Sequence, residues 1–512
     1  MNSKPGQIGY VYLIGAGPGD PGLITVRGLE CIGLADVIMY DYLASTSLLE
    51  HARPEAELVY AGKVGGAHNR EQGQINEMLV EKARQGKTVA RLKGGDPFIF
   101  GRGGEECEAL VEAGIPFEIV PGVTAGIGAA AYAGIPLTHR DYTASVAFVT
   151  GHESSGKEVS AIDWEKLSVG SGTLVFYMGM KNLPQIAANL LDNGRAPETP
   201  VALIRWGTRP EQEVLEGTLS DIGDKARKAG FKAPAITVVG EVVRLRNMLR
   251  WFDSRPLFGK GILVTRGSGQ AGPFARLLRD RGARVYQCPT IEIIPPENFN
   301  DLDRDIHSLP EFDWVVFTSA NGVGFFFDRL SALGLDSRAL GTCKVAAVGP
   351  KTAERLACFG IRPDLLPSGY HAEGLVEAFG RMKVSGMKAL YPKGDRARDI
   401  VVTGLGNMGM EVSAPVSYRT VTPESVPGEV LAALEERRIS CVTFTSSSTV
   451  ANLASMVGEN HLIHLLKGVA VASIGPVTSA ACSDLGLPVD VEPHVSTVEA
   501  LTEAIVTHFT AA

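Results

Sequence analysis

The residues with the clearest capacity for chemistry lie in a glycine-rich string, GGDPFIFGRGGEE, at positions 94–106. Its adjacent glycines would let a ligand approach the backbone closely, and the carboxylate of Asp96 can accept hydrogen bonds from an ammonium or hydroxyl group. Arg102, between two glycines, is expected to be unshielded and free to hold a carboxylate through a bidentate pair. The string therefore predicts a binding loop; the alternative is a solvated loop rich in glycine.

A second glycine-rich turn, GAGPGD, occupies positions 15–20. A dinucleotide-binding fingerprint would need a third glycine where Asp20 stands, and the acidic side chain of Asp20 would repel phosphate. Pro18 and Pro21 also extend the turn. The turn therefore indicates contact with a cofactor that does not present phosphate, or a purely structural bend.

Buried β-strands are expected to position these segments. Apolar runs at 11–14, 36–41, 88–92 and 117–120 predict strands, and further strands are expected to begin near 145, 172, 199 and 235. Open α/β sheets bind ligands at the carboxyl ends of their strands, where both glycine-rich segments and Asp41 fall. An aspartate at a strand end is otherwise often a helix N-cap, so both interpretations of Asp41 stay open.

The second half of the chain contains an internal duplication. The string FTSAN at 317–321 recurs as FTSSS at 444–448, and VGPKTA at 348–353 recurs as IGPVTS at 474–479, at an offset of about 127 residues, which indicates duplicated domains and not a solenoid. The repeat predicts two similar α/β units that face each other, with threonine-bearing turns lining the cleft between them. A basic and aromatic stretch before the duplication predicts a short linker at 246–258.

The bulk properties exclude several classes of protein. A chain of 512 residues predicts two to four domains, and its net charge of −8 argues against nonspecific nucleic-acid binding. Seven scattered cysteines without a C-x-x-C pair predict inert thiols in a reducing compartment, with neither a disulfide nor a metal site. No apolar run reaches about 18 residues and the chain starts without an apolar leader, so we expect no membrane association and a cytoplasmic location.

These motifs, together with PGVTA at 121–125 and GIPLTHR at 134–140, resemble the tetrapyrrole methylases and match their uroporphyrinogen-III C-methyltransferase branch from about residue 9 to 245. The duplicated half, from about 259 to 512, is similar to the uroporphyrinogen-III synthases through weaker motifs. The resemblance implies an α/β fold: a two-lobed methylase domain at 1–245, the linker at 246–258, and at 259–512 two flavodoxin-like α/β units that form a clamshell.

The resemblance also implies which residues act. An S-adenosylmethionine site would be made by Pro18, Gly94, Gly95, Asp96, Ile99, Thr124, Ala125, Met178 and Gly207. Asp41 matches the family's proposed proton acceptor and Lys63 the proposed donor, while the carboxylates of the substrate would meet Lys63, Arg102 and Arg140. The synthase-like half supplies candidate catalytic hydroxyls from Tyr418, Thr352 and Thr478. A core methionine remains the alternative for Met178, and an interface ring with a wet hydroxyl for Tyr418.

The implied reactions are consecutive. The second half would cyclise hydroxymethylbilane to uroporphyrinogen III, and the first half would methylate that product at C2 and C7 to give precorrin-2, for sirohaem or cobalamin. Electron-rich pyrrole carbons can attack a sulfonium methyl group directly, so catalysis would be mainly positioning, without a metal. A homodimer through the methylase domain is expected. Two alternatives stay open: an RNA methyltransferase of the same superfamily, disfavoured by the negative net charge, and a non-catalytic, ligand-sensing clamshell.

Overall fold

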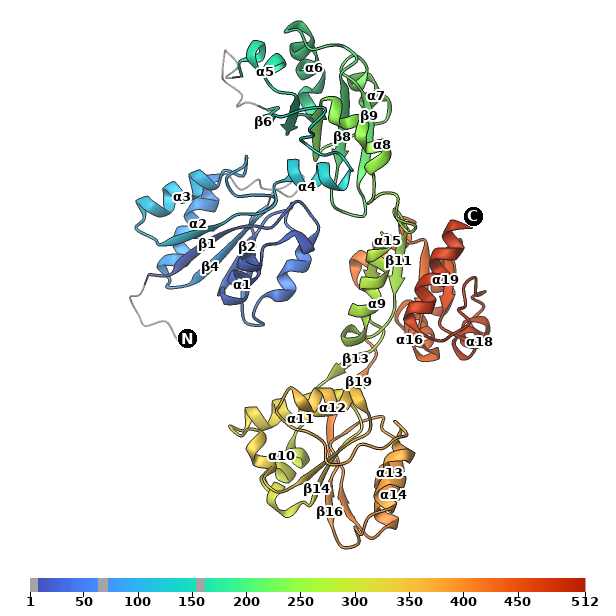
Figure 1. Cartoon of the computed structure of the whole chain (residues 1–512). Helices are drawn as coiled ribbons and strands as arrows, with labels where there is room; N and C mark the ends of the chain where they lie inside the picture. Colours follow the sequence, from blue (N-terminus) through green and yellow to red (C-terminus); the bar gives the residue numbers. More distant parts are fainter. Residues whose placement is uncertain (1–7, 63–71, 153–161, 512) are drawn as a thin grey trace. The chain divides into compact units, whose positions relative to one another are not determined.

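The structure is a computed structural model that describes residues 8–62, 72–152 and 162–511. The chain divides into two compact units, one of residues 1–260 with 279–284 and the other of residues 261–278 with 285–512 (Figure 1). Within the described ranges, no helix is long and apolar enough to cross a membrane.

The first unit begins with a parallel sheet that has the strand order β3-β2-β4-β1-β5. Its strands are β1 (Tyr10–Gly15), β2 (Val37–Tyr40), β3 (Glu57–Tyr60), β4 (Thr88–Lys93) and β5 (Phe117–Val120). Alternate residues face opposite sides, so Leu13 packs toward α2 (Gln72–Arg84) and α3 (Gly103–Glu112), whereas Ile14 packs toward α1 (Val26–Leu34). Figure 1 shows α2 and α3 on one face of this sheet and α1 on the other.

The parallel arrangement brings the predicted functional segments to one edge. The turn at 15–20, Asp41 and the string at 94–106 follow β1, β2 and β4, which are neighbours in the sheet, so all three segments lie at the same carboxyl-terminal edge. The strands predicted from the apolar runs are confirmed. The sequence did not predict β3, an edge strand in which Glu57 and Leu58 are exposed.

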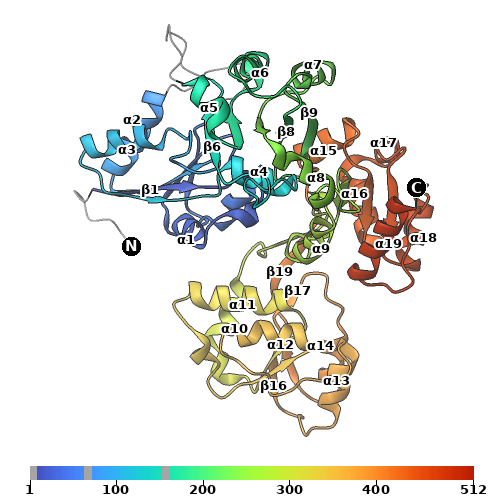
Figure 2. The same ribbon diagram turned by 45° about the horizontal axis from the view of Figure 1, so that its top comes forward.

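A second, mixed sheet completes the first unit, with the order β6-β7-β10-β8-β9. Its strands are β6 (Val146–Thr150), β7 (Thr173–Tyr177), β8 (Pro200–Arg205), β9 (Glu213–Thr218) and β10 (Ala235–Val239). Only the β6–β7 pair is parallel. One face is covered by α5 (Trp164–Gly170), α6 (Leu183–Asp192) and α7 (Ile222–Lys228), and the other by α4 (Ala125–Tyr132), as Figure 2 shows.

The stretch at 246–258, where the sequence predicts a linker, is packed against the first unit. It starts with the short helix α8 (Arg246–Leu249), and Phe252 and Leu257 are buried. Arg246 is also buried; its guanidinium donates to the carbonyl oxygen of Ala133 at 2.6 Å and to Glu216 at 3.0 Å. The basic and aromatic composition of this stretch therefore reflects packing contacts.

The second unit contains two four-stranded sheets, ordered β12-β11-β20-β21 and β15-β14-β16-β18, and a small sheet ordered β13-β19-β17. The strands of the first are β11 (Gly261–Val264), β12 (Arg284–Gln287), β20 (Cys441–Phe444) and β21 (Ala470–Ser473). Those of the second are β14 (Trp314–Phe317), β15 (Lys344–Ala347), β16 (Lys388–Leu390) and β18 (Glu411–Ser413). The small sheet consists of β13 (Glu292–Ile294), β17 (Lys393–Gly394) and β19 (Val416–Val421).

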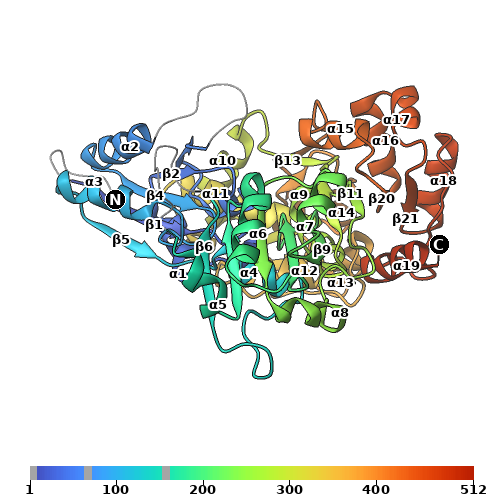
Figure 3. The same cartoon turned by 90° about the horizontal axis from the view of Figure 1, so that it is seen from above.

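Helices cover both four-stranded sheets. On the sheet of β14 and β16, α10 (Asn300–His307), α11 (Ala320–Ala332) and α12 (Pro350–Ala357) lie on one face, with α13 (Ala372–Gly380) and α14 (Ile400–Asn407) on the other (Figures 1 and 2). Around β20 and β21 are α9 (Ser268–Asp280), α15 (Gly428–Glu435), α16 (Ser447–Val457), α17 (Glu459–Leu465), α18 (Pro476–Asp484) and α19 (Val498–Thr510). Figure 3 shows α16 and α19 on opposite sides of these two strands.

The duplication is visible in local hydrogen bonding. Ser319 caps α11 by accepting from the backbone N–H of Gly322, and Ser446 caps α16 in the same way. The carboxylate of Asp364 accepts from the N–H of Val345 at 2.8 Å, and its counterpart Asp490 accepts from the N–H of Val471 at 2.8 Å. The two repeats therefore share their strand-to-helix turns as well as their sequence.

The duplication led us to expect two separate α/β units, but the repeats do not fold in that way. Strand β11 of the first repeat pairs with β20 of the second, and β14 of the first pairs with β16 of the second. Each four-stranded sheet thus takes two strands from each repeat. An internal repeat in the sequence indicates that two segments have similar structures. It does not indicate whether the strands of one repeat pair with each other or with strands of the other repeat.

Candidate active sites

A cavity of about 620 Å³ in the first unit brings most of the predicted cofactor residues together. Those that line it are Pro18, Gly94, Gly95, Ile99, Thr124, Ala125, Met178 and Gly207. They come from the carboxyl-terminal edge of the first sheet and from the ends of β7 and β8 in the second. The cavity lies where ligands bind in open α/β sheets, and its volume is that of a small-molecule site.

Asp96 is the one predicted cofactor residue that is not among the lining residues. Its Oδ1 accepts from the N–H groups of Phe98 and Ile99, at 2.8 and 3.2 Å, and its Oδ2 accepts from the N–H of Gly122 at 3.0 Å. Both oxygens therefore hold the backbone of the loop. The expected contact of Asp96 with a ligand ammonium or hydroxyl group stays a prediction.

The glycines of the site are required by close packing. A Cβ atom on Gly94 would lie 2.4 Å from the Cβ of Leu43, and one on Gly207 would lie 2.3 Å from the Cβ of Ala129. These approaches lie far inside van der Waals contact, so the loops sit as they do only because no side chain is present. Both glycines also line the cavity, and the close approach of a ligand to their backbone stays a prediction.

Backbone strain is concentrated around the cavity. Non-glycine residues with positive φ include Phe100, Met178 and Trp206, which line it, and their neighbours Arg102 and Thr208. Such conformations cost roughly 1–3 kcal/mol each and persist only where the surrounding structure fixes them. The strain indicates a cavity wall that is shaped before any ligand arrives.

The turn at 15–20 is fixed by polar contacts from the segments that border the cavity. The hydroxyl of Tyr132 donates to Oδ2 of Asp20 at 2.7 Å, and the N–H of Asp20 donates to Oγ1 of Thr208 at 3.0 Å. Asp20 is thus occupied by the protein itself. The turn presents Pro18 to the cavity without a phosphate-binding surface.

Tyr177, at the end of β7, was not predicted from the sequence. Its hydroxyl lies 2.8 Å from Oγ1 of Thr124 and accepts from the N–H of Gly126 at 2.8 Å. Burial raises the pKa of this phenol, so it stays a neutral donor and acceptor. The residue therefore holds the start of α4, which carries two predicted cofactor residues, against the second sheet.

Replacing Tyr177 by phenylalanine is expected to lower the free energy of unfolding by roughly 1–3 kcal/mol, because Thr124 and Gly126 would lose their buried partner. Affinity for the cofactor should fall several-fold for the same reason. Thermal denaturation and titration calorimetry would measure both effects. The control is Tyr142→Phe, since Tyr142 is 44% exposed; equal losses in both variants would contradict the role of Tyr177.

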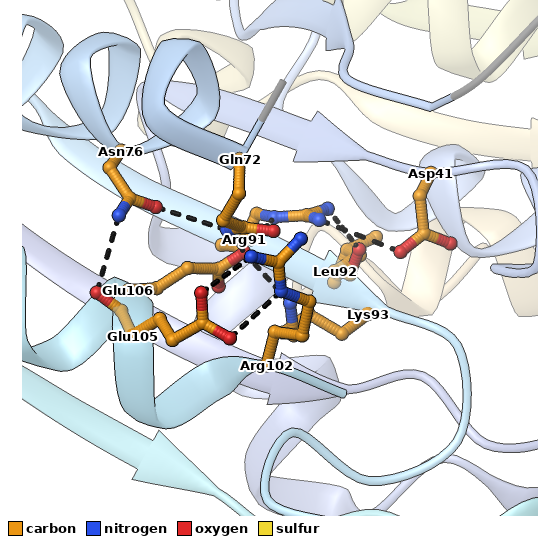
Figure 4. Close-up of polar contacts among 9 residues, drawn as sticks. All are labelled: Asp41, Gln72, Asn76, Arg91, Leu92, Lys93, Arg102, Glu105 and Glu106. Atoms are coloured by element: carbon orange, nitrogen blue, oxygen red, sulfur yellow. Dashed lines mark hydrogen bonds and ion pairs between the residues drawn. The ribbon is translucent and has the colours of Figure 1, made fainter. Parts of the chain in front are cut away.

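Asp41 follows β2 and combines the two interpretations left open by the sequence. Its Oδ1 accepts from the N–H groups of Leu43 and Ala44, at 3.0 and 3.2 Å, so it caps a turn, although not a helix. Its Oδ2 lies 3.6 Å from Nη2 of Arg91, and the side chain remains 24% exposed (Figure 4). One oxygen therefore builds the turn, while the other faces the guanidinium of Arg91.

The sequence led us to expect a free Arg102 side chain, but in the structure it is paired with Glu105. Its guanidinium donates to both carboxylate oxygens of Glu105, at 2.8 and 2.6 Å, because the helix that begins after Arg102 places Glu105 one turn away (Figure 4). The pair is half-exposed, and such pairs are worth at most about 1 kcal/mol.

Arg102 also borders a second hollow, of about 600 Å³, which shares Phe100 and Met178 with the first cavity. Arg140 is exposed, and Lys63 lies outside the described residues.

In the second unit, Tyr418 lies within β19 and not at a strand end. Its hydroxyl is 3.0 Å from Oγ of Ser319, which belongs to the first of the repeated FTS motifs. Its ring stacks on Phe325, with the ring centres 5.8 Å apart, and lies so close to Gly394 that a Cβ there would be 2.7 Å away. Tyr418 thus joins the small sheet to the turn that starts α11.

Thr352 and Thr478 occupy equivalent positions, each as the third residue of a helix that begins with proline after a glycine N-cap. Both are 4% exposed. The two threonines are buried because each helix packs against its own sheet, and their predicted place in a cleft stays a prediction.

Several cavity residues carry no signal in the sequence. Leu43, Lys181, Trp206 and Arg209 line the cavity, and Arg209 donates to the carbonyl oxygen of Leu43 at 2.9 Å while its guanidinium lies 4.8 Å from the centre of the Trp206 ring. Only their positions just after strands could have indicated them.

Comparison with known proteins separates the two units. Residues 10–223 match the family model of the tetrapyrrole (corrin/porphyrin) methylases, and residues 272–503 match that of uroporphyrinogen-III synthase HemD. The porphyrin biosynthesis protein HemD of Ruminiclostridium josui is 40% identical over 453 residues, which cover 88% of this chain and 89% of that protein. The uroporphyrinogen-III C-methyltransferase of Bacillus subtilis is 43% identical over 361 residues, or 70% of this chain and 74% of that protein. A crystal structure of uroporphyrin-III C-methyltransferase from Thermus thermophilus with S-adenosylhomocysteine covers 46% of this chain, at 38% identity and a TM-score of 0.41.

Proposed function

We infer that this chain, which belongs to the tetrapyrrole methylases through its first unit and to the uroporphyrinogen-III synthases through its second, is a bifunctional enzyme of tetrapyrrole biosynthesis. The second unit cyclises hydroxymethylbilane to uroporphyrinogen III. The first transfers two methyl groups, at C2 and C7, from S-adenosylmethionine to give precorrin-2, the precursor of sirohaem and cobalamin. The observation that carries this conclusion is the relative 40% identical over 453 residues, which spans both units.

The cavity of about 620 Å³ is proposed as the site of S-adenosylmethionine. Its lining suits the ligand: Ile99, Met178 and Ile204 offer apolar surface, and Gly94 and Gly95 bring backbone without side chains to the cavity wall. When bound there, S-adenosylmethionine supplies an electrophilic methyl group on sulfur. The residues of the chain bind and orient it, and the strained loops at Phe100 and Met178 keep the wall in place.

The hollow beside the cavity is proposed as the site of the tetrapyrrole ring. Phe98, Phe100 and Met178 give it an apolar floor, and Arg102 at its rim can exchange Glu105 for a substrate carboxylate. Methylation leaves a cationic ring that must lose a proton. Asp41 is proposed to accept that proton through Oδ2, and Lys63 remains the proposed proton donor.

The finer architecture is also a proposal. We propose a two-lobed methylase at 1–245, a connecting segment at 246–258 and a synthase at 259–512 that closes as a clamshell. The cavity lining supports the two lobes, since Gly94 follows a strand of one sheet and Met178 a strand of the other. The small sheet that links the two four-stranded sheets supports the clamshell. Tyr418 in that sheet, with Thr352 and Thr478, is proposed to serve the cyclisation.

A homodimer through the first unit is proposed on the basis of an apolar surface. A hollow lined by Ile127, Ala131, Ile135, Pro136, Leu137 and Phe148 borders β6, an edge strand on which Val146 is 37% exposed. Light scattering coupled to gel filtration would measure the oligomeric state. A cytoplasmic location is supported by the cysteines, all of which are free thiols.

The purified enzyme is expected to transfer two labelled methyl groups to each uroporphyrinogen III when supplied with methyl-labelled S-adenosylmethionine. Mass spectrometry of the products formed from hydroxymethylbilane, with and without the methyl donor, would test both activities. Without it, uroporphyrinogen III should accumulate. Label found only in added RNA would contradict the assignment.

A further inference from the structure

A buried cluster of charges lies behind Asp41 and is not explained by the binding of either ligand. Arg91 and Lys93 project from β4 and meet Glu106 of α3, and the side chains of all three are at most 4% exposed (Figure 4). Oε1 of Glu106 lies 2.8 Å from Nζ of Lys93 and 3.4 Å from Nε of Arg91, and accepts from Gln72 at 3.2 Å. Because burying charges is costly, a cluster of this kind calls for a function.

Glu106 fixes the orientation of Arg91. Nε of the guanidinium donates to Glu106, and Nη1 donates to the carbonyl oxygen of Leu92 at 2.8 Å. Nη2 lies 3.6 Å from Oδ2 of Asp41. Three nitrogens of the guanidinium are therefore engaged, and only Nη2 faces Asp41. Without Glu106, nothing else among the described residues accepts from Nε of Arg91.

Among the residues that the structure describes, the cluster is also balanced in charge. Asp41 and Glu106 carry two negative charges, and Arg91 and Lys93 carry two positive ones. Burial lowers the pKa of Lys93, as does the neighbouring Arg91, so its ammonium form depends on Glu106. When Asp41 takes up a proton, the balance shifts by one charge, and the cost of that step depends on the other three groups.

We propose that Glu106 is a positioning residue for the methylation: by neutralising Arg91 and Lys93 and by locking Arg91, it sets how readily Asp41 accepts a proton. This inference rests on the proposed role of Asp41. Two adjacent cations alone would hold Asp41 in its ionised form and make it a poor base. Glu106 offsets them. Its second oxygen, Oε2, is buried with no hydrogen-bond partner in the described part of the chain, so the pairing with Arg91 and Lys93 is made by Oε1.

The groups that face Asp41 in the described residues come from two strands. Arg91 and Lys93 belong to β4, and Tyr60 belongs to β3. Lys63 lies outside the described residues. Asp41 must be ionised to accept a proton, so the methylation rate should fall on the acid side of the pH profile. Removing a nearby anion favours the ionised carboxylate, and removing a nearby cation favours the protonated one.

The test is the pH dependence of kcat/KM for methylation in Glu106→Gln, Lys93→Met and the double variant. The acid limb should move to lower pH by about one unit in Glu106→Gln and to higher pH by about one unit in Lys93→Met. The double variant restores the charge balance, so its limb should lie near that of the native enzyme. Glu112→Gln, an exposed change on the same helix, is the matched control and should leave the limb in place.

A purely structural role for Glu106 would lower the rate without opposite shifts of the limb. The proposal is overturned if the acid limb stays in place in both single variants, or if it moves in the same direction in both. This conclusion holds when Asp41→Asn abolishes turnover, because the role of Asp41 itself is then intact. If Glu106→Gln does not fold, the question is decided by comparing the double variant with Lys93→Met. If the acid limbs of these two variants coincide, removing Glu106 has no effect on the limb and the proposal is refuted. Full turnover in Asp41→Asn would instead refute the role of Asp41, and this inference with it.

Discussion

Replacing Asp41 by asparagine is expected to lower kcat for methylation by roughly 10²–10⁴-fold while the affinity for S-adenosylmethionine hardly changes. An asparagine has the same size, and its amide oxygen can still accept from the N–H groups of Leu43 and Ala44, so the turn after β2 should persist. What the variant lacks is a group that can take a proton from the methylated ring. Single-turnover kinetics and titration calorimetry would measure the two quantities separately.

The matched control for this variant is Asp36→Asn, at the other end of the same strand. Asp36 accepts from the N–H of Thr88 at 2.8 Å and pairs with Arg53 at 2.6 Å, away from the carboxyl-terminal edge of the sheet. Its loss should reduce stability and leave kcat near the native value. If Asp41→Asn fails to fold, or keeps its full rate, Asp41 returns to the status of a turn cap.

Replacing Tyr418 by phenylalanine is expected to lower the formation of uroporphyrinogen III by about tenfold or more. In the cyclisation, the substrate loses its terminal hydroxyl, and the resulting azafulvene attacks an already substituted carbon to give a spiro intermediate that fragments and closes again. The departing hydroxyl needs a hydrogen-bond donor, and the phenol of Tyr418, held by Ser319, is the proposed one. Phenylalanine keeps the stacking on Phe325, so the fold should survive.

The assay must resolve product isomers, because hydroxymethylbilane also cyclises spontaneously to the wrong one. Tyr391→Phe is the control: Tyr391 is buried, and its hydroxyl lies 2.9 Å from Oγ1 of Thr318, beside Ser319. That change should cost stability and little activity. Thr352→Ala and Thr478→Ala should each cost less than the loss of Tyr418. Unchanged isomer III in Tyr418→Phe would leave the unit as a template that only folds the substrate.

The sequence predicted the fold best where burial imposes a pattern. The strands β1 and β2 are continuous apolar runs, because a parallel sheet covered on both faces admits few other residues. The strands β3 and β9 lie at sheet edges and were missed, since half-exposed strands such as Glu57–Tyr60 mix polar and apolar side chains. Edge strands leave a weak pattern for this physical reason.

The candidate site was predictable to the extent that it depends on glycine. Gly94 and Gly207 pack so closely against other segments that no side chain fits there, and this requirement for glycine is visible in the sequence. The residues that they contact are distant in the sequence. The contributions of Tyr177 and Arg209 could not be predicted, because they arise from the second sheet and leave no local motif. Glu106 looks like one of two surface glutamates until the fold shows that it is completely buried.

The exchange of strands between the two repeats has a consequence for the synthesis of the chain. Thr265 at the end of β11 donates to the carbonyl oxygen of Thr443, a residue 178 positions later, and at about 5–20 residues per second a ribosome needs about 10–40 s to cover that distance. The intervening sheet of β14, β15, β16 and β18 is complete well before then. The edge of β11 that pairs with β20 must therefore wait without its partner, although β12 is already present at the other edge, and we expect chaperones to meet the nascent chain at this stage.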